Sequence, residues 1–330
     1  MAESRSAVPF RYRVEYVAFS IALACLRVFS ERCALATGAG LGWLVGTVLR
    51  IRRRVTDENL AHAFPDQDRN WRDRVARASY TNLGREAVAS FRYSGESAER
   101  IRARTADPIG MGAVLDAVAN GRGAILITGH LGNWELAGAA VAARGIPIDA
   151  VAVRQANHLF DEALTRNRAA LGMNLVRRGE APRKLLRSLR VGRVPALLAD
   201  QNARSSGVFV DFLGRLASTS RGPAVLALRA GVPLFLGTCM PHPKLSGRYL
   251  CEVEEIRAER TGNLKQDVRH LTEAHTAALA AKIRQRPEHY LWQHRRWRTA
   301  PGSSVQGERA NAVAGRSDVP PAHRPGLPEA

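Results

Sequence analysis

The chain has 330 residues, 45% of them apolar, which is enough for one large α/β domain or two smaller domains with a substantial core. Its 49 basic and 30 acidic side chains give a formal net charge of +19, and such an excess indicates a polyanionic partner: nucleic acid, a phospholipid surface, or an acidic protein or ligand. The composition excludes a disordered acidic chain, a collagen and a disulfide-rich scaffold, but it does not select the polyanion.

Residues 1–54 carry two apolar stretches, 16–26 and 33–49, with arginines on both sides of the pair. The second stretch has 17 residues without a charge, close to the lower limit for a bilayer span. Because both flanks are basic, the positive-inside rule would place both ends on the cytoplasmic side. We therefore expect apolar membrane-associating helices that re-enter the bilayer or lie in its plane. Two ordinary core helices, or a cleaved signal peptide, are the alternatives.

Residues 55–299 form the predicted main domain. Apolar residues near a 3.6-residue period predict helix from residue 71 to about residue 121. Beyond this point short β-like runs alternate with helical stretches, which predicts an α/β fold with a mostly parallel central sheet flanked by helices. The expected strands are 124–128, 148–153, 194–199, 208–212, 233–239 and 249–253, and the expected helices are 133–144, 159–171, 181–190, 219–230 and 264–286.

Residues 300–330 are predicted to be a disordered tail, because they are rich in Pro and Gly and almost without large apolar side chains. Three basic and three acidic side chains in this tail cancel. The excess positive charge therefore belongs to residues 1–300 and not to a basic arm.

The sharpest chemical signal follows the first expected strand. Gly129 ends that strand, His130 stands at its carboxyl edge, and the next helix carries Glu135. Ligands and catalytic groups of open α/β sheets lie at this edge. His130 could accept a proton from an attacking hydroxyl while the Glu135 carboxylate fixes its tautomer and stabilises the imidazolium. The spacing alone is weak, since roughly one such pair is expected by chance, and a structural histidine is the alternative.

The segment His130-Leu-Gly-Asn-Trp-Glu135 resembles the His-x4-Glu core of the bacterial lipid A biosynthesis lauroyl/myristoyl acyltransferases, within the lysophospholipid acyltransferase superfamily. The resemblance covers most of residues 50–298. Its further matches, in chain order, are residues 53–55 with 59–65, 153–157, Arg168 (or Arg166) with Gly172, 198–201, 208–214 and 287–297.

This resemblance implies a glycerolipid-acyltransferase-like fold, with residues 55–299 as the catalytic domain. It implies an enzyme on the cytoplasmic face of the inner membrane that moves a fatty acyl chain from acyl carrier protein to a glycolipid hydroxyl, with a lipid A precursor as the expected acceptor. His130 would be the general base and Glu135 would orient it. Acyl carrier protein or coenzyme A would carry the acyl group, and no further cofactor and no metal are expected. The anticipated partners are the carrier protein, an anionic membrane surface and a phosphorylated glycolipid, and not nucleic acid.

Five further residues are candidates for substrate binding. Asn133 could cap the helix after His130 or donate to the thioester oxygen. Arg154 and Arg168 could contact phosphate or thioester, although Arg168 could also lie on a solvated helix face. Asp200 and Gln201, at a strand end, could hold an arginine or the sugar, or cap a turn.

Near the end of the domain, Trp292, Arg295, Arg296 and Trp297 combine aromatic rings with guanidinium groups. This mixture is typical of a membrane interface, where the rings are half buried and the guanidiniums meet lipid phosphate. Tryptophans packed in the core beside surface arginines are the alternative.

Other functions compete with this interpretation. The acceptor could be a phosphatidylinositol mannoside, an ornithine lipid or a lysophospholipid, but Glu135 and the His-Leu-Gly sequence favour the lipid A branch. Water could replace the acceptor and make the protein a thioesterase. A nucleic-acid binder would explain the charge, yet the sequence shows no zinc finger, RNP-type motif or clear helix-turn-helix.

Overall fold

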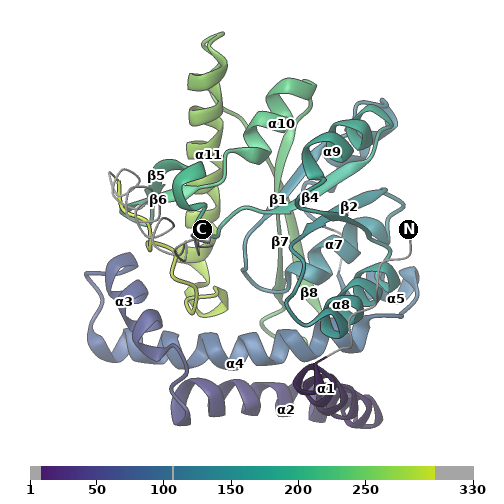
Figure 1. Ribbon diagram of the computed structural model, residues 1–330, viewed down its shortest axis with the longest axis vertical. Helices are drawn as coiled ribbons and strands as arrows, with labels where there is room; N and C mark the ends of the chain where they lie inside the picture. The colour runs from purple at the N-terminus through teal and green to yellow at the C-terminus, as the bar shows by residue number, and fades with distance from the viewer. Residues whose placement is uncertain (1–8, 106–107, 302–330) are drawn as a thin grey trace, which may run out of the picture.

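The computed structural model describes residues 9–105 and 108–301, and its centre is a six-stranded sheet with the strand order β3-β2-β4-β1-β7-β8 (Figure 1). All neighbouring strands are parallel except β8, which pairs antiparallel with β7. The prediction of a mostly parallel α/β sheet is confirmed. The strands are β1 Ile125–Thr128, β2 Ile148–Ala152, β3 Asn174–Arg177, β4 Val194–Leu198, β7 Leu234–Pro241 and β8 Tyr249–Ile256.

Helices cover both faces of the sheet, as parallel sheets require. The central strand β1 shows this directly, since Ile125 and Ile127 pack into one hydrophobic core and Leu126 packs into the other. The first core contains α9 Ala181–Arg190, α10 Gly222–Ala230 and α11 Leu264–Gln285, and the second contains α6 Met111–Ala119 and α7 Trp134–Ala142. α8 His158–Ala170 leads into the edge strand β3.

Three features differ from the expected elements. The helical stretch 71–121 is three helices: α4 Arg69–Tyr93, α5 Ala98–Arg104 and α6. Strand β3 was not predicted. The strand β5 Val208–Phe212 was predicted, but its antiparallel partner β6 Arg215–Thr219 was not. Two short 3-10 helices, Arg204–Ser206 and Pro287–His289, complete this part of the chain. The predicted disorder of residues 300–330 falls, from residue 302 onward, outside the described residues.

The N-terminal apolar segment forms α1 Phe10–Val28, α2 Glu31–Trp43, a π-helical turn Leu44–Val48 and α3 Arg53–Ala63. α2 lies along α4, where glycines allow the backbones to meet: a Cβ atom on Gly42 would lie 2.1 Å from the carbonyl oxygen of Tyr80. The other side of this segment leaves large apolar side chains exposed, namely Leu41, Trp43, Leu44, Val48, Leu49 and Ile51.

In the described chain no helix is by itself long and apolar enough to cross a membrane. Residues 31–48 and α3 together meet the length and composition required, with a bend of 89° between them. Membrane association of the N-terminal helices therefore stays a prediction.

Candidate active site

His130 lies on a short loop that joins β1 to α7 and is held by backbone hydrogen bonds to the terminal segment and to β7. Its carbonyl oxygen accepts a hydrogen bond from Leu291 N–H at 3.0 Å, and Asn133 N–H donates to the carbonyl oxygen of Cys239 at 2.8 Å. Gly132 has φ +63°, and a Cβ atom there would lie 2.3 Å from the Cys239 oxygen. Only glycine fits this position without distortion. The loop is thus fixed before any substrate binds.

The partner of His130 is Asp200, at the end of the adjacent strand β4. The sheet register pairs Thr128 with Leu198, so His130 and Asp200 each follow their strand's paired end by two residues. The His130 N–H donates to Asp200 Oδ2 at 2.8 Å, and His130 Nδ1 lies 2.8 Å from Asp200 Oδ1. This arrangement leaves Nε2 as the free ring nitrogen, with Gln201 Nε2 3.4 Å away.

The two groups shift each other's pKa. Burial alone would raise the pKa of Asp200, but the charge of His130 and the hydrogen bonds from its ring and backbone outweigh this and lower it to about 2. Burial would lower the pKa of His130, whereas the charge of Asp200 and its hydrogen bond raise it, and the net direction is upward. The Asp200 side chain is 2% exposed and that of His130 is 13% exposed, so the pair is shielded yet reachable.

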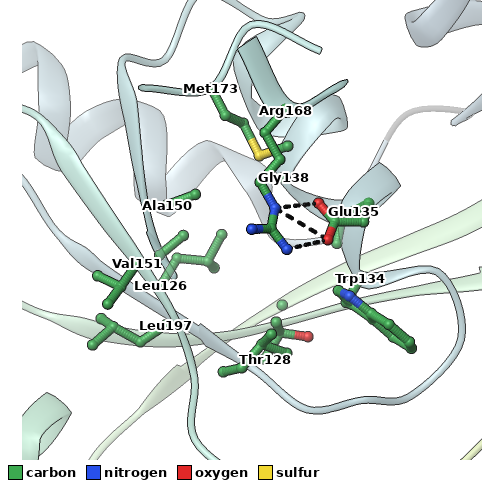
Figure 2. Close-up of a pocket in the computed structure, with 14 residues that line it drawn as sticks. Leu126, Thr128, Trp134, Glu135, Gly138, Ala150, Val151, Arg168, Met173 and Leu197 are labelled. Carbon is green, nitrogen blue, oxygen red and sulfur yellow. Dashed lines mark hydrogen bonds and ion pairs between the residues drawn. The ribbon is translucent and has the colours of Figure 1, made fainter. Parts of the chain in front are cut away.

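Glu135 faces Arg168 instead of His130. Arg168 donates from Nε to Glu135 Oε2 at 2.9 Å and from a terminal nitrogen to Oε1 at 2.6 Å (Figure 2). Burial lowers the pKa of Arg168, but the Glu135 hydrogen bonds more than restore it, so the ion pair is maintained. The expectation that Glu135 orients His130 is corrected: the carboxylate bonded to the imidazole belongs to Asp200.

Asn133 is the N-cap of α7 and lies away from the site. Its Oδ1 accepts the backbone N–H of Leu136 at 2.9 Å, and its Nδ2 donates to Glu86 at 2.9 Å. Burial raises the pKa of Glu86, which also accepts a hydrogen bond from Tyr249. Because Asn133 is 1% exposed with its amide engaged, the expected substrate contact is wrong and the helix cap is confirmed.

The remaining substrate-binding candidates separate into two groups. Arg168 and Gln201 lie beside Glu135 and His130 respectively. Arg154 is exposed on the loop that follows β2 and is not brought to the His130–Asp200 pair by any hydrogen bond or ion pair found in the described chain.

The expected membrane interface near the end of the domain is wrong for two of its four residues. Trp292 is fully buried, and Arg296 is 1% exposed, with its guanidinium donating to Ser218 O at 2.7 Å and lying 4.9 Å from the Phe212 ring centre. Trp297 is partly buried against the same core, and Arg295 is exposed. Trp292 and Arg296 therefore anchor the terminal segment beside the His130 loop.

A small apolar cavity of about 50 Å³ lies under the ion pair, between α7 and the sheet (Figure 2). Its mouth contains Glu135, Arg168 and Trp134, whose ring packs 4.9 Å from the His130 ring. The other lining residues are small or aliphatic, among them Leu126, Gly138, Ala150, Val151, Met173 and Leu197. Sequence reasoning gave no role to Trp134, although it lies within the His130–Glu135 motif, and it missed Met173 and this cavity, which no motif marks.

The fold and this site define an α/β protein in which a buried carboxylate holds a histidine close to an apolar cavity. A family model described as "Bacterial lipid A biosynthesis acyltransferase" matches residues 5–299. The chain belongs to this family, and it is an acyltransferase.

Curated relatives carry two kinds of name. A phosphatidylinositol mannoside acyltransferase of Mycolicibacterium smegmatis is 32% identical over 170 residues, which span 50% of this chain and 55% of the relative. A protein of the same name from Mycobacterium tuberculosis is 30% identical over 68% of this chain and 71% of its own length. The lipid A biosynthesis lauroyltransferase of Escherichia coli is 27% identical over 80% and 85% respectively.

Proposed function

We propose that the protein transfers a fatty acyl chain from a thioester on acyl carrier protein, or on coenzyme A, to a hydroxyl of a phosphorylated glycolipid. The observation that carries this proposal is the His130–Asp200 pair, whose imidazole packs against Trp134, a residue that lines an apolar cavity. A base that can reach a hydroxyl and an adjacent apolar cavity that can receive the start of an acyl chain are the two elements that this reaction requires.

In the proposed mechanism His130 Nε2 takes the proton of the acceptor hydroxyl as its oxygen attacks the thioester carbonyl carbon. The tetrahedral intermediate then collapses, the carbon–sulfur bond breaks, and the imidazolium returns the proton to the leaving thiolate. Asp200 keeps Nδ1 as the N–H of the ring and stabilises the imidazolium. No acyl-enzyme forms, because the acceptor itself is the nucleophile.

Glu135 takes a different role from the one first expected. Its ion pair with Arg168 forms a rigid, charged rim over the apolar cavity. In our proposal this rim keeps the thioester end of the acyl group at the surface while the hydrocarbon enters below it. A cavity of about 50 Å³ holds only the first carbons of a chain, so Met173, a flexible side chain, has to move for longer chains.

Two glycolipids are candidates for the acceptor. A lipid A precursor is the first candidate, because the family model that matches residues 5–299 is described as a lipid A biosynthesis acyltransferase. A phosphatidylinositol mannoside is the second, because the mycobacterial relatives of that name show 30–32% identity. Both lipids carry phosphate and sugar hydroxyls.

The enzyme is proposed to work at the cytoplasmic face of the inner membrane. Exposed Phe10, Val14, Val17 and Ile21 on α1, together with the exposed apolar residues of 41–51, would contact the lipid, and the arginines that follow residue 49 would meet anionic headgroups. In this proposal the net charge of +19 attracts three anionic partners: the membrane surface, the phosphorylated acceptor and the acidic carrier protein.

Mass spectrometry can test the proposal. Purified protein in detergent is incubated with acyl carrier protein thioesters and coenzyme A thioesters of several chain lengths, and with either a tetra-acylated lipid A precursor or a phosphatidylinositol mannoside. We expect the mass of one acceptor to rise by one acyl group. If neither acceptor gains mass with any donor while the thioesters are hydrolysed, the protein is a thioesterase and the proposed transfer is wrong.

A further inference from the structure

A second, strongly basic cleft lies outside the site described above. It has a volume of about 740 Å³ and is lined by Arg52, Arg54, His62, Arg215, Arg295 and Arg298. These residues come from α3 and the residue before it, from β6 and from the terminal segment, and α3 and the β5–β6 hairpin lie on the same side of the molecule (Figure 1). Its size is in the range of small-ligand sites, roughly 300–1,000 Å³.

The charge of this cleft is largely uncompensated. Elsewhere several partly buried arginines have carboxylate partners, as Arg104 has with Glu31 and Glu96. Among the five arginines of the cleft, Arg54 alone has an ion-pair partner in the described chain, the lining residue Glu58. Several like charges that line one concave surface repel one another, and an anion bound among them relieves this repulsion.

The histidine of the cleft is consistent with this positive potential. Burial lowers the pKa of His62, and the charge of Arg215 lowers it further. Arg215 can therefore contact a neutral imidazole. His62 then offers the cleft a hydrogen-bonding group without adding a positive charge that would repel the arginines.

The cleft is joined to the His130–Asp200 pair through His294. His294 Nε2 accepts a hydrogen bond from the backbone N–H of Asn202, two residues after Asp200, and the next residue is Arg295 of the cleft. Burial lowers the pKa of His294, and among the charges that act on it are those of Asp200, His130 and Arg52. His294 therefore contacts the segment that carries Asp200 and directly precedes a lining residue of the cleft.

The cleft also continues from the exposed apolar surface of residues 41–51. Leu49 and Ile51 are 58% and 51% exposed, and Arg52 and Arg54 follow directly in the chain. If that surface contacts lipid, the cleft lies at the depth of lipid headgroups, where phosphate is found.

From this arrangement we infer that the basic cleft binds the phosphate of the lipid acceptor and thereby presents a sugar hydroxyl of the same molecule to His130. The inference rests on the proposed acyl transfer to a phosphorylated glycolipid and adds the subsite that recognises the acceptor. The guanidiniums of Arg295 and Arg298 are the phosphate ligands that lie nearest in sequence to His294.

Calorimetric titration of the full-length protein tests this assignment with soluble phosphates. The probes are glucosamine 1-phosphate and glycerophosphoinositol as acceptor headgroups, inorganic phosphate, and 4′-phosphopantetheine as the donor arm. The variant is Arg295→Ala/Arg298→Ala. The control, Arg183→Ala/Arg187→Ala, removes the same charge from two exposed positions on α9, on the other side of the molecule (Figure 1).

We expect an acceptor headgroup to bind wild-type protein more tightly than inorganic phosphate, and the cleft variant to weaken it at least about tenfold, the effect of losing one charge-assisted hydrogen bond. The control should bind like wild type. In transfer assays the cleft variant should raise KM for the phosphorylated acceptor more than it changes kcat.

Three results would overturn the assignment: no headgroup binding by wild-type protein, equal weakening in the control, or dependence on Arg295 and Arg298 for 4′-phosphopantetheine alone, which would make the cleft a donor site. Failure of the proposed function gives a different result, since headgroup binding would persist while neither acceptor is acylated.

Discussion

His130 has one ring nitrogen bound to Asp200 and the other 3.4 Å from Gln201 Nε2, so its chemistry depends on which nitrogen carries the proton. The Asp200 carboxylate, with its pKa lowered to about 2, stays ionised at any pH at which the enzyme would work, and it retains the proton on Nδ1. Nε2 is then the nitrogen that acts as the base in our proposal, and this assignment leads to two predictions.

His130→Ala should lower acyl transfer by about 10²–10⁴-fold, the usual contribution of a general base. The His130 backbone bonds to Asp200 and Leu291 do not need the ring, so the melting temperature should stay close to that of wild type. His270→Ala, at a partly exposed position on α11, is the matched control. Near-wild-type turnover by folded His130→Ala protein would eliminate the mechanism.

The pH profile distinguishes Asp200 from Glu135. Burial lowers the pKa of His130, and Asp200 raises it more than Glu135 does. Since the protonated imidazole cannot act as a base, kcat/KM should fall as the pH drops through the His130 pKa. Asp200→Asn should move this acidic limb to lower pH and reduce the rate, while Glu135→Gln should move it less. A larger shift in Glu135→Gln than in Asp200→Asn would return the orienting role to Glu135.

Sequence could find His130 but not its partner. A Gly-His pair at the end of an apolar run marks a strand edge, whereas the contact with Asp200 depends on β4 lying next to β1 in a register that pairs Thr128 with Leu198. Trp292 and Arg296 were misassigned for a related reason. Residue type does not tell whether such a side chain faces lipid or packs inside the protein, as Trp292 does against Tyr290 and Arg296 does against the β5–β6 hairpin.

At the scale of elements, the long apolar runs could be predicted and the short polar ones could not. β3 has the sequence Asn-Leu-Val-Arg at a sheet edge, and β6 begins with Arg215, so neither shows a strand pattern. The β5–β6 turn has positive φ at Leu213 and Gly214, but leucine is not the Asn or Asp that usually marks such a hairpin.

The contact between α2 and α4 should be sensitive to one methyl group. Gly42→Ala would place Cβ 2.1 Å from the Tyr80 carbonyl oxygen and force the helices apart, which should lower the free energy of unfolding by about 1–3 kcal/mol. Gly40→Ala, on the same helix with open space around it, should instead raise that free energy by about 0.5–1 kcal/mol. Urea unfolding of both variants measures the difference, and equal effects would contradict the close packing.

The cavity beneath α7 should control acyl chain length. A Cβ atom at Gly138 would already lie 2.4 Å from Met173 Sδ, so Gly138→Leu should fill the space of about 50 Å³. We expect turnover of long-chain donors to fall relative to short-chain donors in a competition assay. Gly112→Leu, at an exposed helical glycine with no atom near its Cβ, is the control. An unchanged product distribution would exclude this cavity as the acyl site.

At the scale of the whole molecule, the exposed apolar residues and much of the uncompensated basic charge lie together. The apolar surface of residues 41–51 leads into the arginines of the basic cleft, while the ion pairs of Arg104, Arg168 and Arg193 neutralise charge elsewhere. The net charge of +19 alone could not reveal this separation.

This arrangement predicts which surface binds membranes. Leu49→Glu should weaken binding to anionic phospholipid vesicles about tenfold or more, because one buried leucine contributes about 1.5–3 kcal/mol and the new carboxylate is repelled. Val191→Glu makes the same kind of change at a more exposed position at the end of α9, which lies away from α2 and α3 (Figure 1), and should bind vesicles like wild type. Vesicle sedimentation at two salt concentrations checks both, and equal binding by both variants would place the membrane surface elsewhere.

The bond between Leu291 and the His130 carbonyl has a consequence for biosynthesis. The carbonyl oxygens of Trp292 and His294 in the terminal segment also accept hydrogen bonds from Asn59 of α3. Residues synthesised early, midway and late in the chain therefore meet around the His130 loop and the terminal segment. A nascent chain that has emerged only as far as α11 therefore lacks the residues that hold the His130 loop in place. Activity should appear abruptly, when the last tryptophans leave the ribosome, and truncated products should be inert toward thioesters.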